Sequence, residues 1–169
     1  VYTTHIRGEG NQLKESIEEA LVIGRESGIP VNISHIKVIG RQNEGNSRDI
    51  IRYIEENQKA GMTITADQYP FTGGSAPLIS QIPHKYLTAG KAEGLRCLAE
   101  SAELRKQAEW SIFHEAHEFE SNIYSAGYEG CLIAGAYKTK EHIGKTLAQL
   151  AEEQGKTPFD ACIDLLAAN

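Results

Sequence analysis

The sequence predicts an α/β fold built on a parallel β-sheet, because short β-forming runs alternate with segments that each have room for one helix. The runs are rich in β-branched and aromatic residues and cover 2–6, 31–36 and 62–66. A polar residue lies within one residue of the end of each run, and the steps from His5 to His35 and from His35 to Asp67 are 30 and 32 residues. That interval is the period of a strand, a crossover helix and the next parallel strand.

The first helix is expected over 13–27, where apolar residues recur from Leu13 at +4, +7, +8 and +11. Asn11 is the expected N-cap. Gly28 can adopt the left-handed conformation that ends a helix, and Pro30 blocks its continuation.

A long loop over 39–46 leads to the second helix, which should open with Ser47 as its N-cap and end at Gly61. Because parallel strands place their carboxyl ends at one edge of a sheet, His5, His35 and Asp67 are expected to lie at that edge.

The regular alternation stops after residue 75. The expected elements beyond it are helices over 83–98, 102–113, 144–154 and 158–168 and an isolated strand over 130–134. Thr157 and Pro158 suit the N-cap and first position of the last helix. We predict three parts: 1–75 with the sheet and its motifs, 76–143 as an inserted small α/β subdomain that is mostly helical, and 144–169 as returning helices.

The composition favours small-molecule chemistry. A net charge of −6 without a basic block argues against nucleic-acid binding, and no apolar run is long enough for a membrane span. Three widely spaced cysteines suit free thiols in a reducing compartment, so a cytoplasmic location is expected. Both ends are abrupt, with β-formers from Val1 and no helix stop before Asn169, which suggests a piece of a longer protein.

His5 and His35 have two open interpretations. A single histidine in a strand is more often a hydrogen-bonded structural residue than a ligand. Two histidines at equivalent depth on adjacent parallel strands, about 4.8 Å apart, can share one metal ion. Lys37 and Tyr69 each lie two residues past His35 and Asp67, and a cation and a phenol beside a metal suit an anionic substrate.

Two other motifs are weaker. Residues 114–117 (His-Glu-Ala-His) are one residue short of the His-Glu-x-x-His zinc motif and suit a solvated helix face. Residues 40–45 have the glycine spacing of a phosphate loop but lack its lysine, so they suit a flexible loop over the site.

The motifs at the strand ends resemble those of a known family. Residues 4–9 (Thr-His-Ile-Arg-Gly-Glu), 34–37 (Ser-His-Ile-Lys) and 67–75 (Asp-Gln-Tyr-Pro-Phe-Thr-Gly-Gly-Ser) are similar to motifs of the N-acyl-D-amino-acid deacylase (D-aminoacylase) family of the amidohydrolase superfamily. The resemblance is strong over 1–75 and loose over 76–143. It implies part of a TIM (β/α)8 barrel, strands five to seven, with 144–169 as helices that return to the barrel.

The resemblance also implies the roles of the site residues. His5 and His35 would bind Zn²⁺, one or two ions in the full-length parent, and Lys37, Tyr69 and Ser75 would bind the carboxylate of a small-molecule N-acyl-amino acid. Asp67 would orient Arg7 or His35 behind the metal. Zinc would polarise the amide carbonyl and activate a water molecule for hydrolysis.

Several parts of the family pattern have no counterpart in this sequence. They are the His-x-His of strand one, a metal-bridging cysteine and the general-base aspartate of strand eight. We therefore expect this piece alone to be inactive and to self-associate through exposed strand edges. Two alternatives stay open for the parent: a dihydroorotase-like cyclic amidase, and a non-catalytic small-molecule-binding module.

Overall fold

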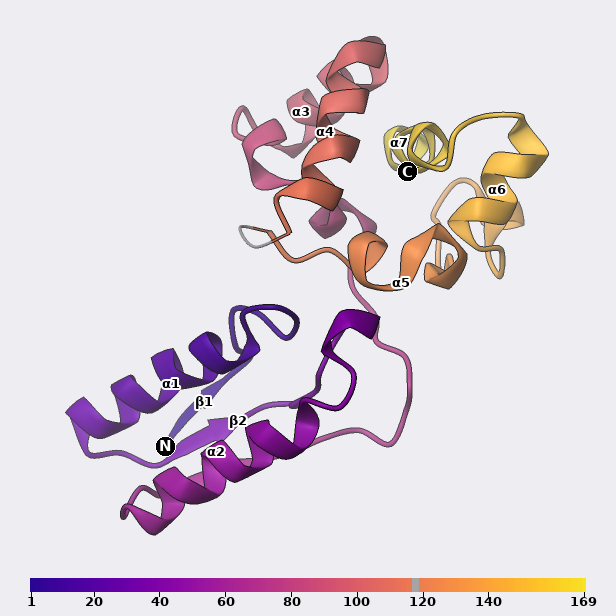
Figure 1. Ribbon diagram of the computed structural model, residues 1–169. Helices are drawn as coiled ribbons and strands as arrows, with labels where there is room; N and C mark the ends of the chain where they lie inside the picture. Colours follow the sequence, from indigo (N-terminus) through magenta and orange to yellow (C-terminus); the bar gives the residue numbers. More distant parts are fainter. Residues whose placement is uncertain (117–118) are drawn as a thin grey trace. The chain divides into compact units, whose positions relative to one another are not determined.

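The computed structural model describes residues 1–116 and 119–169 (Figure 1). The chain divides into two compact units, Val1–Gly74 and Ser75–Asn169, and each has its own hydrophobic core. In the described part of the chain, no helix combines the length and apolar character that a membrane crossing requires.

The first unit is a three-stranded parallel sheet with two crossover helices. The strands are β1 (Tyr2–Thr4), β2 (Val31–Ile33) and β3 (Ile64–Ala66), and they lie in the order β1-β2-β3. Helix α1 (Leu13–Ser27) links β1 to β2, and α2 (Ser47–Lys59) links β2 to β3. The predicted α/β fold with a parallel sheet is therefore confirmed.

Helix α1 has the bounds that its sequence predicts at both ends. Gly28 caps its C-terminus in the left-handed conformation at φ 67°, as expected. The N-cap is Gln12 instead of Asn11. Asn11 lies one residue earlier, and its side-chain oxygen accepts hydrogen bonds from the side-chain amides of Gln42 and Asn43 in the long loop.

The strands are shorter than the sequence suggests. β2 was expected to reach residue 36 but ends at Ile33, because the chain turns at Ser34 and His35. His35 has a φ of 40°, a left-handed conformation that breaks the pleat. Backbone pairing resumes beyond the turn, where the amide of Ile36 donates to the carbonyl of Asp67 at 2.9 Å.

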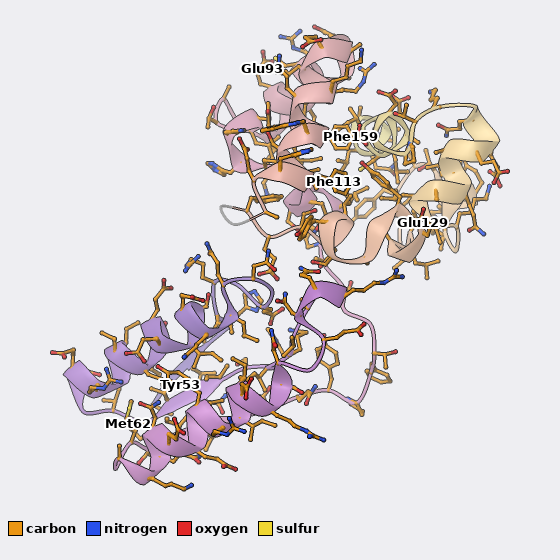
Figure 2. The ribbon with its side chains drawn as sticks, in the orientation of Figure 1. Tyr53, Met62, Glu93, Phe113, Glu129 and Phe159 are labelled. Carbon is orange, nitrogen blue, oxygen red and sulfur yellow. The ribbon has the colours of Figure 1, made fainter. Side chains whose placement is uncertain are left out.

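The core of the first unit lies between the sheet and its helices. Its buried residues are Ile6, Leu13, Ile17, Ala20, Leu21, Val31, Ile33, Ile50 and Ile64. Tyr53 of α2, labelled in Figure 2, donates a hydrogen bond to Glu18 of α1 and so ties the two helices together. This packing fixes the carboxyl ends of the strands.

The second unit is mostly helical, and Phe159 is fully buried in its core (Figure 2). Its helices are α3 (Lys91–Glu100), α4 (Ala102–His114), α5 (Asn122–Gly130), α6 (Leu147–Gln154) and α7 (Pro158–Ala168). Thr157 caps α7 by accepting a hydrogen bond from the amide of Asp160, with Pro158 at the first position, as predicted.

Three expectations for the second unit need correction. The helix expected over 83–98 is broken, because Gly90 has a φ of 103° and separates a 3-10 turn (His84–Tyr86) from α3. The strand expected over 130–134 is reduced to one antiparallel bridge between Leu132 and Thr146. Helix α5 was not anticipated. Helices α6 and α7 share the core of this unit, and their return to a barrel stays a prediction.

Candidate metal centre

The three polar residues identified in the sequence lie at the carboxyl edge of the sheet. His5 and Asp67 directly follow β1 and β3, whereas His35 comes two residues after β2. Thr4 pairs with Ile33, so His5 is level with Ser34 and His35 is one residue further along. The left-handed turn at His35 takes up this extra residue.

His5 and His35 face each other closely. The Nδ1 atom of His5 lies 2.9 Å from the Nε2 atom of His35, and the ring centroids are 4.6 Å apart. Two nitrogens bound tetrahedrally to one zinc ion at 2.0–2.1 Å would lie roughly 3.4 Å apart. A small opening of this pair would therefore accommodate a shared metal ion.

Glu9 is the residue that the sequence reasoning did not select. Its side chain is only 9% exposed, and its Oε1 atom lies 3.1 Å from His35 Nδ1 and 3.9 Å from His5 Nδ1. Each of these three residues offers a ligand atom, and the three atoms lie within 4.8 Å of one another. The available signal was a glutamate four residues after His5 and flanked by two glycines.

Lys37 belongs to the same cluster. Its ammonium group forms an ion pair with Glu9, lies 3.0 Å from His35 Nδ1 and sits 5.5 Å from the centre of the Tyr69 ring. Lys37 and Tyr69 are therefore neighbours, and their role in substrate binding stays a prediction. Ser75 belongs to the second unit, and its contribution to the site stays a prediction.

Asp67 contacts the backbone of His35. It accepts hydrogen bonds from the His35 amide at 2.7 Å and from the Asn32 side chain at 3.0 Å. Both hydrogen bonds lower the pKa of Asp67, because they stabilise its charged form. Asp67 thus holds the turn that carries His35.

Arg7 makes its contacts on the α1 side of the loop after β1. Its guanidinium donates to Glu19 at 2.8 Å and also to Gln12, and the ion pair lowers the pKa of Glu19. Among the described contacts, Arg7 is joined to neither Asp67 nor His35. Its role behind the metal stays a prediction.

The two weaker motifs have ordinary structural surroundings. His114 is the last residue of α4 and stacks on Trp110 with the ring centroids 4.5 Å apart, while His117 lies outside the described residues. The glycine-rich loop over 40–45 contains a short 3-10 turn, Arg41–Asn43.

Two imidazoles at the carboxyl edge of a parallel sheet, with a nearly buried carboxylate beside them, form a candidate divalent-metal site. Comparison with curated proteins shows which known sequences the chain resembles. The chain is 42% identical over 78 residues to a D-aminoacylase of Alcaligenes xylosoxydans xylosoxydans, an alignment that covers 46% of this chain and 16% of the relative. It is 33% identical over 81 residues to an N-acyl-D-glutamate deacylase of the same organism, over 48% of this chain and 17% of the relative.

Solved structures of such enzymes are also similar to this chain. A D-aminoacylase crystal structure, described as defining a novel subset of amidohydrolases, matches 97% of this chain with a TM-score of 0.63 and 27% identity. The zinc- and phosphonate-bound N-acyl-D-glutamate deacylase of Bordetella bronchiseptica matches 99% of the chain with a TM-score of 0.66, but its 24% identity speaks for the fold alone. No family model matches the sequence.

The resemblance to the N-acyl-D-amino-acid deacylases is therefore confirmed. The alignments span about a sixth of the curated relatives (16% and 17%) and about a quarter of the solved structures (26% and 27%).

Proposed function

We propose that this chain forms the metal- and substrate-binding edge of an N-acyl-D-amino-acid deacylase, in which β1, β2 and β3 are strands five to seven of a TIM barrel. The longer protein would hydrolyse the amide bond of N-acyl-D-amino acids. The observation that carries the proposal is the 2.9 Å approach of the His5 and His35 ring nitrogens at the carboxyl edge of the sheet. Similarity to D-aminoacylases supports it.

The donor set of the candidate site suits zinc. Imidazole nitrogens are good zinc ligands, and a catalytic site needs further ligands plus one open position. His5 and His35 would supply two of the ligands, and the others would come from elsewhere in the longer protein. One or two zinc ions bound there would polarise the substrate carbonyl and activate the attacking water. The general base would also come from elsewhere in the longer protein.

Lys37, Tyr69 and Ser75 would bind the free carboxylate of the substrate. The Lys37 ammonium and the Tyr69 ring are already close, with 5.5 Å between the nitrogen and the ring centre. An ammonium contributes charge and a hydroxyl contributes a directional donor, which together recognise a carboxylate. Asp67 would keep His35 in place through its backbone amide.

The relatives favour this function over the two alternatives. The curated relatives and solved structures named above are all D-aminoacylases or deacylases of N-acyl-D-amino acids, which favours linear amides over the ring of a cyclic amidase. A binding module without catalysis would need the longer protein to lack the remaining ligands. A cytoplasmic location remains a proposal based on cysteine usage.

The test is a hydrolysis assay of the full-length protein on a panel of N-acyl-D-amino acids, their L enantiomers and a cyclic amide such as dihydroorotate. We expect turnover of the D series, loss of activity after chelation and recovery with zinc. Turnover of the cyclic amide alone, or no turnover with zinc bound, would contradict the proposal.

A further inference from the structure

Glu9 is the most buried charged group of the candidate metal centre. Its side chain is 9% exposed, and the Oε1 atom contacts both the ring of His35 and the ammonium of Lys37. The backbone of Glu9 is also held, because its carbonyl accepts a hydrogen bond of 2.8 Å from the amide of Ile39 in the long loop. Glu9 is therefore held at a fixed place behind His35.

The two ring nitrogens of His35 face different partners. Nδ1 lies 3.1 Å from the Glu9 carboxylate, and Nε2 lies 2.9 Å from His5. A neutral imidazole carries one proton, and the hydrogen bond made by one nitrogen sets the state of the other. A proton on Nδ1 leaves the Nε2 lone pair directed at the place where His5 would share a metal ion.

Lys37 competes for the same nitrogen, since its ammonium lies 3.0 Å from His35 Nδ1. If Nδ1 carried no proton, the ammonium would have to donate to Nδ1 and to Glu9 at once, and His35 would donate nothing to the carboxylate. If Nδ1 carries the proton, the nearly buried carboxylate gains a second donor at 3.1 Å. The flexible lysine then needs to donate only to Glu9, so the second arrangement is favoured.

We infer that Glu9 is a positioning residue, which accepts the Nδ1 proton of His35 and thereby presents Nε2 as a metal ligand. Carboxylates behind metal-binding histidines commonly have this effect. The same oxygen holds Lys37 beside the metal position and leaves the other ammonium protons to an anionic group of the substrate. The inference rests on the proposed function for its metal and its substrate, but the state of the His35 ring can be measured without either.

The experiment uses the full-length protein, stripped of metal and labelled with ¹⁵N in its histidines, at a pH where an unperturbed histidine is neutral. Long-range ¹H–¹⁵N spectra distinguish the two neutral forms, and the His35 signals are identified by their loss in His35→Ala. We expect the Nδ1–H form in the wild-type protein and a shift toward the Nε2–H form in Glu9→Gln, whose amide can donate to Nδ1. The matched control is Glu93→Gln, which removes a carboxylate paired with Arg96 in the second unit and should leave the His35 ring unchanged.

A second readout is zinc affinity, which should fall roughly 10- to 100-fold in Glu9→Gln and stay unchanged in Glu93→Gln. The Nε2–H form in the wild-type protein would overturn the inference, and that measurement needs no variant to fold. An unchanged His35 ring in a folded Glu9→Gln protein would also overturn it. Neither result depends on turnover, so a protein without deacylase activity could still confirm the role of Glu9.

Discussion

His35 combines an unfavourable backbone conformation with a central place in the candidate site. A non-glycine residue at φ 40° costs on the order of 1–3 kcal/mol and persists only when its surroundings hold it. Here the Asp67 carboxylate accepts the His35 amide at 2.7 Å, and the Glu9 carboxylate lies against its ring. This local strain moves the imidazole next to His5, which an unbroken strand would not do.

At the residue scale, Lys37→Met in the full-length protein should weaken the binding of N-acyl-amino acids by roughly 10- to 100-fold, the worth of a charge-assisted hydrogen bond. The corresponding carboxamides should bind almost as before, because they carry no charge for the ammonium to meet. Inhibition constants for matched acid and amide pairs measure the difference. The control Lys14→Met removes an ammonium that lies over the Tyr53 ring. Equal losses for acids and amides would remove Lys37 from carboxylate binding.

Tyr53→Phe tests a contact outside the site. The hydroxyl of Tyr53 donates to Glu18 and, together with Arg25, lowers the pKa of that carboxyl. Its loss should raise the pKa of Glu18 toward the ordinary value, which a ¹³C titration of the side-chain carboxyls detects. Glu19, whose pKa is lowered by Arg7, is the internal control.

The sign of the pH dependence follows from the lowered pKa. A glutamate whose pKa is lower in the folded chain stabilises the fold above the pKa of the unfolded chain and loses that contribution as the pH falls through the folded value. Tyr53→Phe should therefore be less stable than the wild type near pH 7 and approach its stability in acid. A stability difference that stays constant down to acid pH would show that Glu18 is not involved.

At the scale of elements, the close approach of α1 to β2 depends on Gly24. A Cβ atom at this position would lie 2.3 Å from Cγ2 of Val31, a stiff β-branched side chain in the neighbouring strand. Because β2 leads directly into the turn with Ser34 and His35, the packing of α1 helps to place the candidate ligand.

Gly24→Ala should destabilise the first unit by about 1–2 kcal/mol, since the clash outweighs the gain of about 0.5–1 kcal/mol in helix propensity. Amide hydrogen exchange of Val31 and Ile33 measures the loss locally. Gly73→Ala is the matched control, because a Cβ atom there would meet open space. Unchanged protection in Gly24→Ala would mean that the helix and strand adjust without cost.

The elements show where sequence reasoning succeeds. The bounds of α1 follow from its apolar period, Gly28 and Pro30, which are local features. Two other features depend on tertiary contacts. The end of β2 depends on the hydrogen bond from the His35 amide to Asp67, and the burial of Glu9 depends on the loop whose Ile39 amide donates to the Glu9 carbonyl. Glu9, flanked by two glycines, looks like a solvated turn in the sequence because nothing local indicates that another loop covers it.

At the scale of the whole chain, the two units have separate cores, and the sheet of the first unit has β1 and β3 at its edges within the described residues. Edge strands present backbone groups that readily pair with another chain. The approach of His5 and His35 follows from the spacing of the sequence motifs, whereas the further ligands that the proposed zinc site would need correspond to no motif identified in these 169 residues.

The 169-residue chain by itself should show no deacylase turnover with added zinc and should elute as an associated species in size-exclusion chromatography. Thr3→Lys, on the edge strand β1, should reduce the association. Thr139→Lys makes the same charge change in the second unit and serves as the control. Turnover by a monomeric 169-residue chain would contradict the view that other segments complete the site.

The central claim is that His5 and His35 bind one divalent metal ion, and the zinc content of the full-length protein tests it most directly. Zinc is measured in the purified wild-type protein and in the His5→Ala, His35→Ala and His84→Ala variants, the last of which removes an exposed histidine of the second unit. We expect His84→Ala to keep the zinc of the wild type and both other variants to lose at least one equivalent, because each removes a ligand. Wild-type zinc content in folded His5→Ala and His35→Ala proteins would contradict the claim.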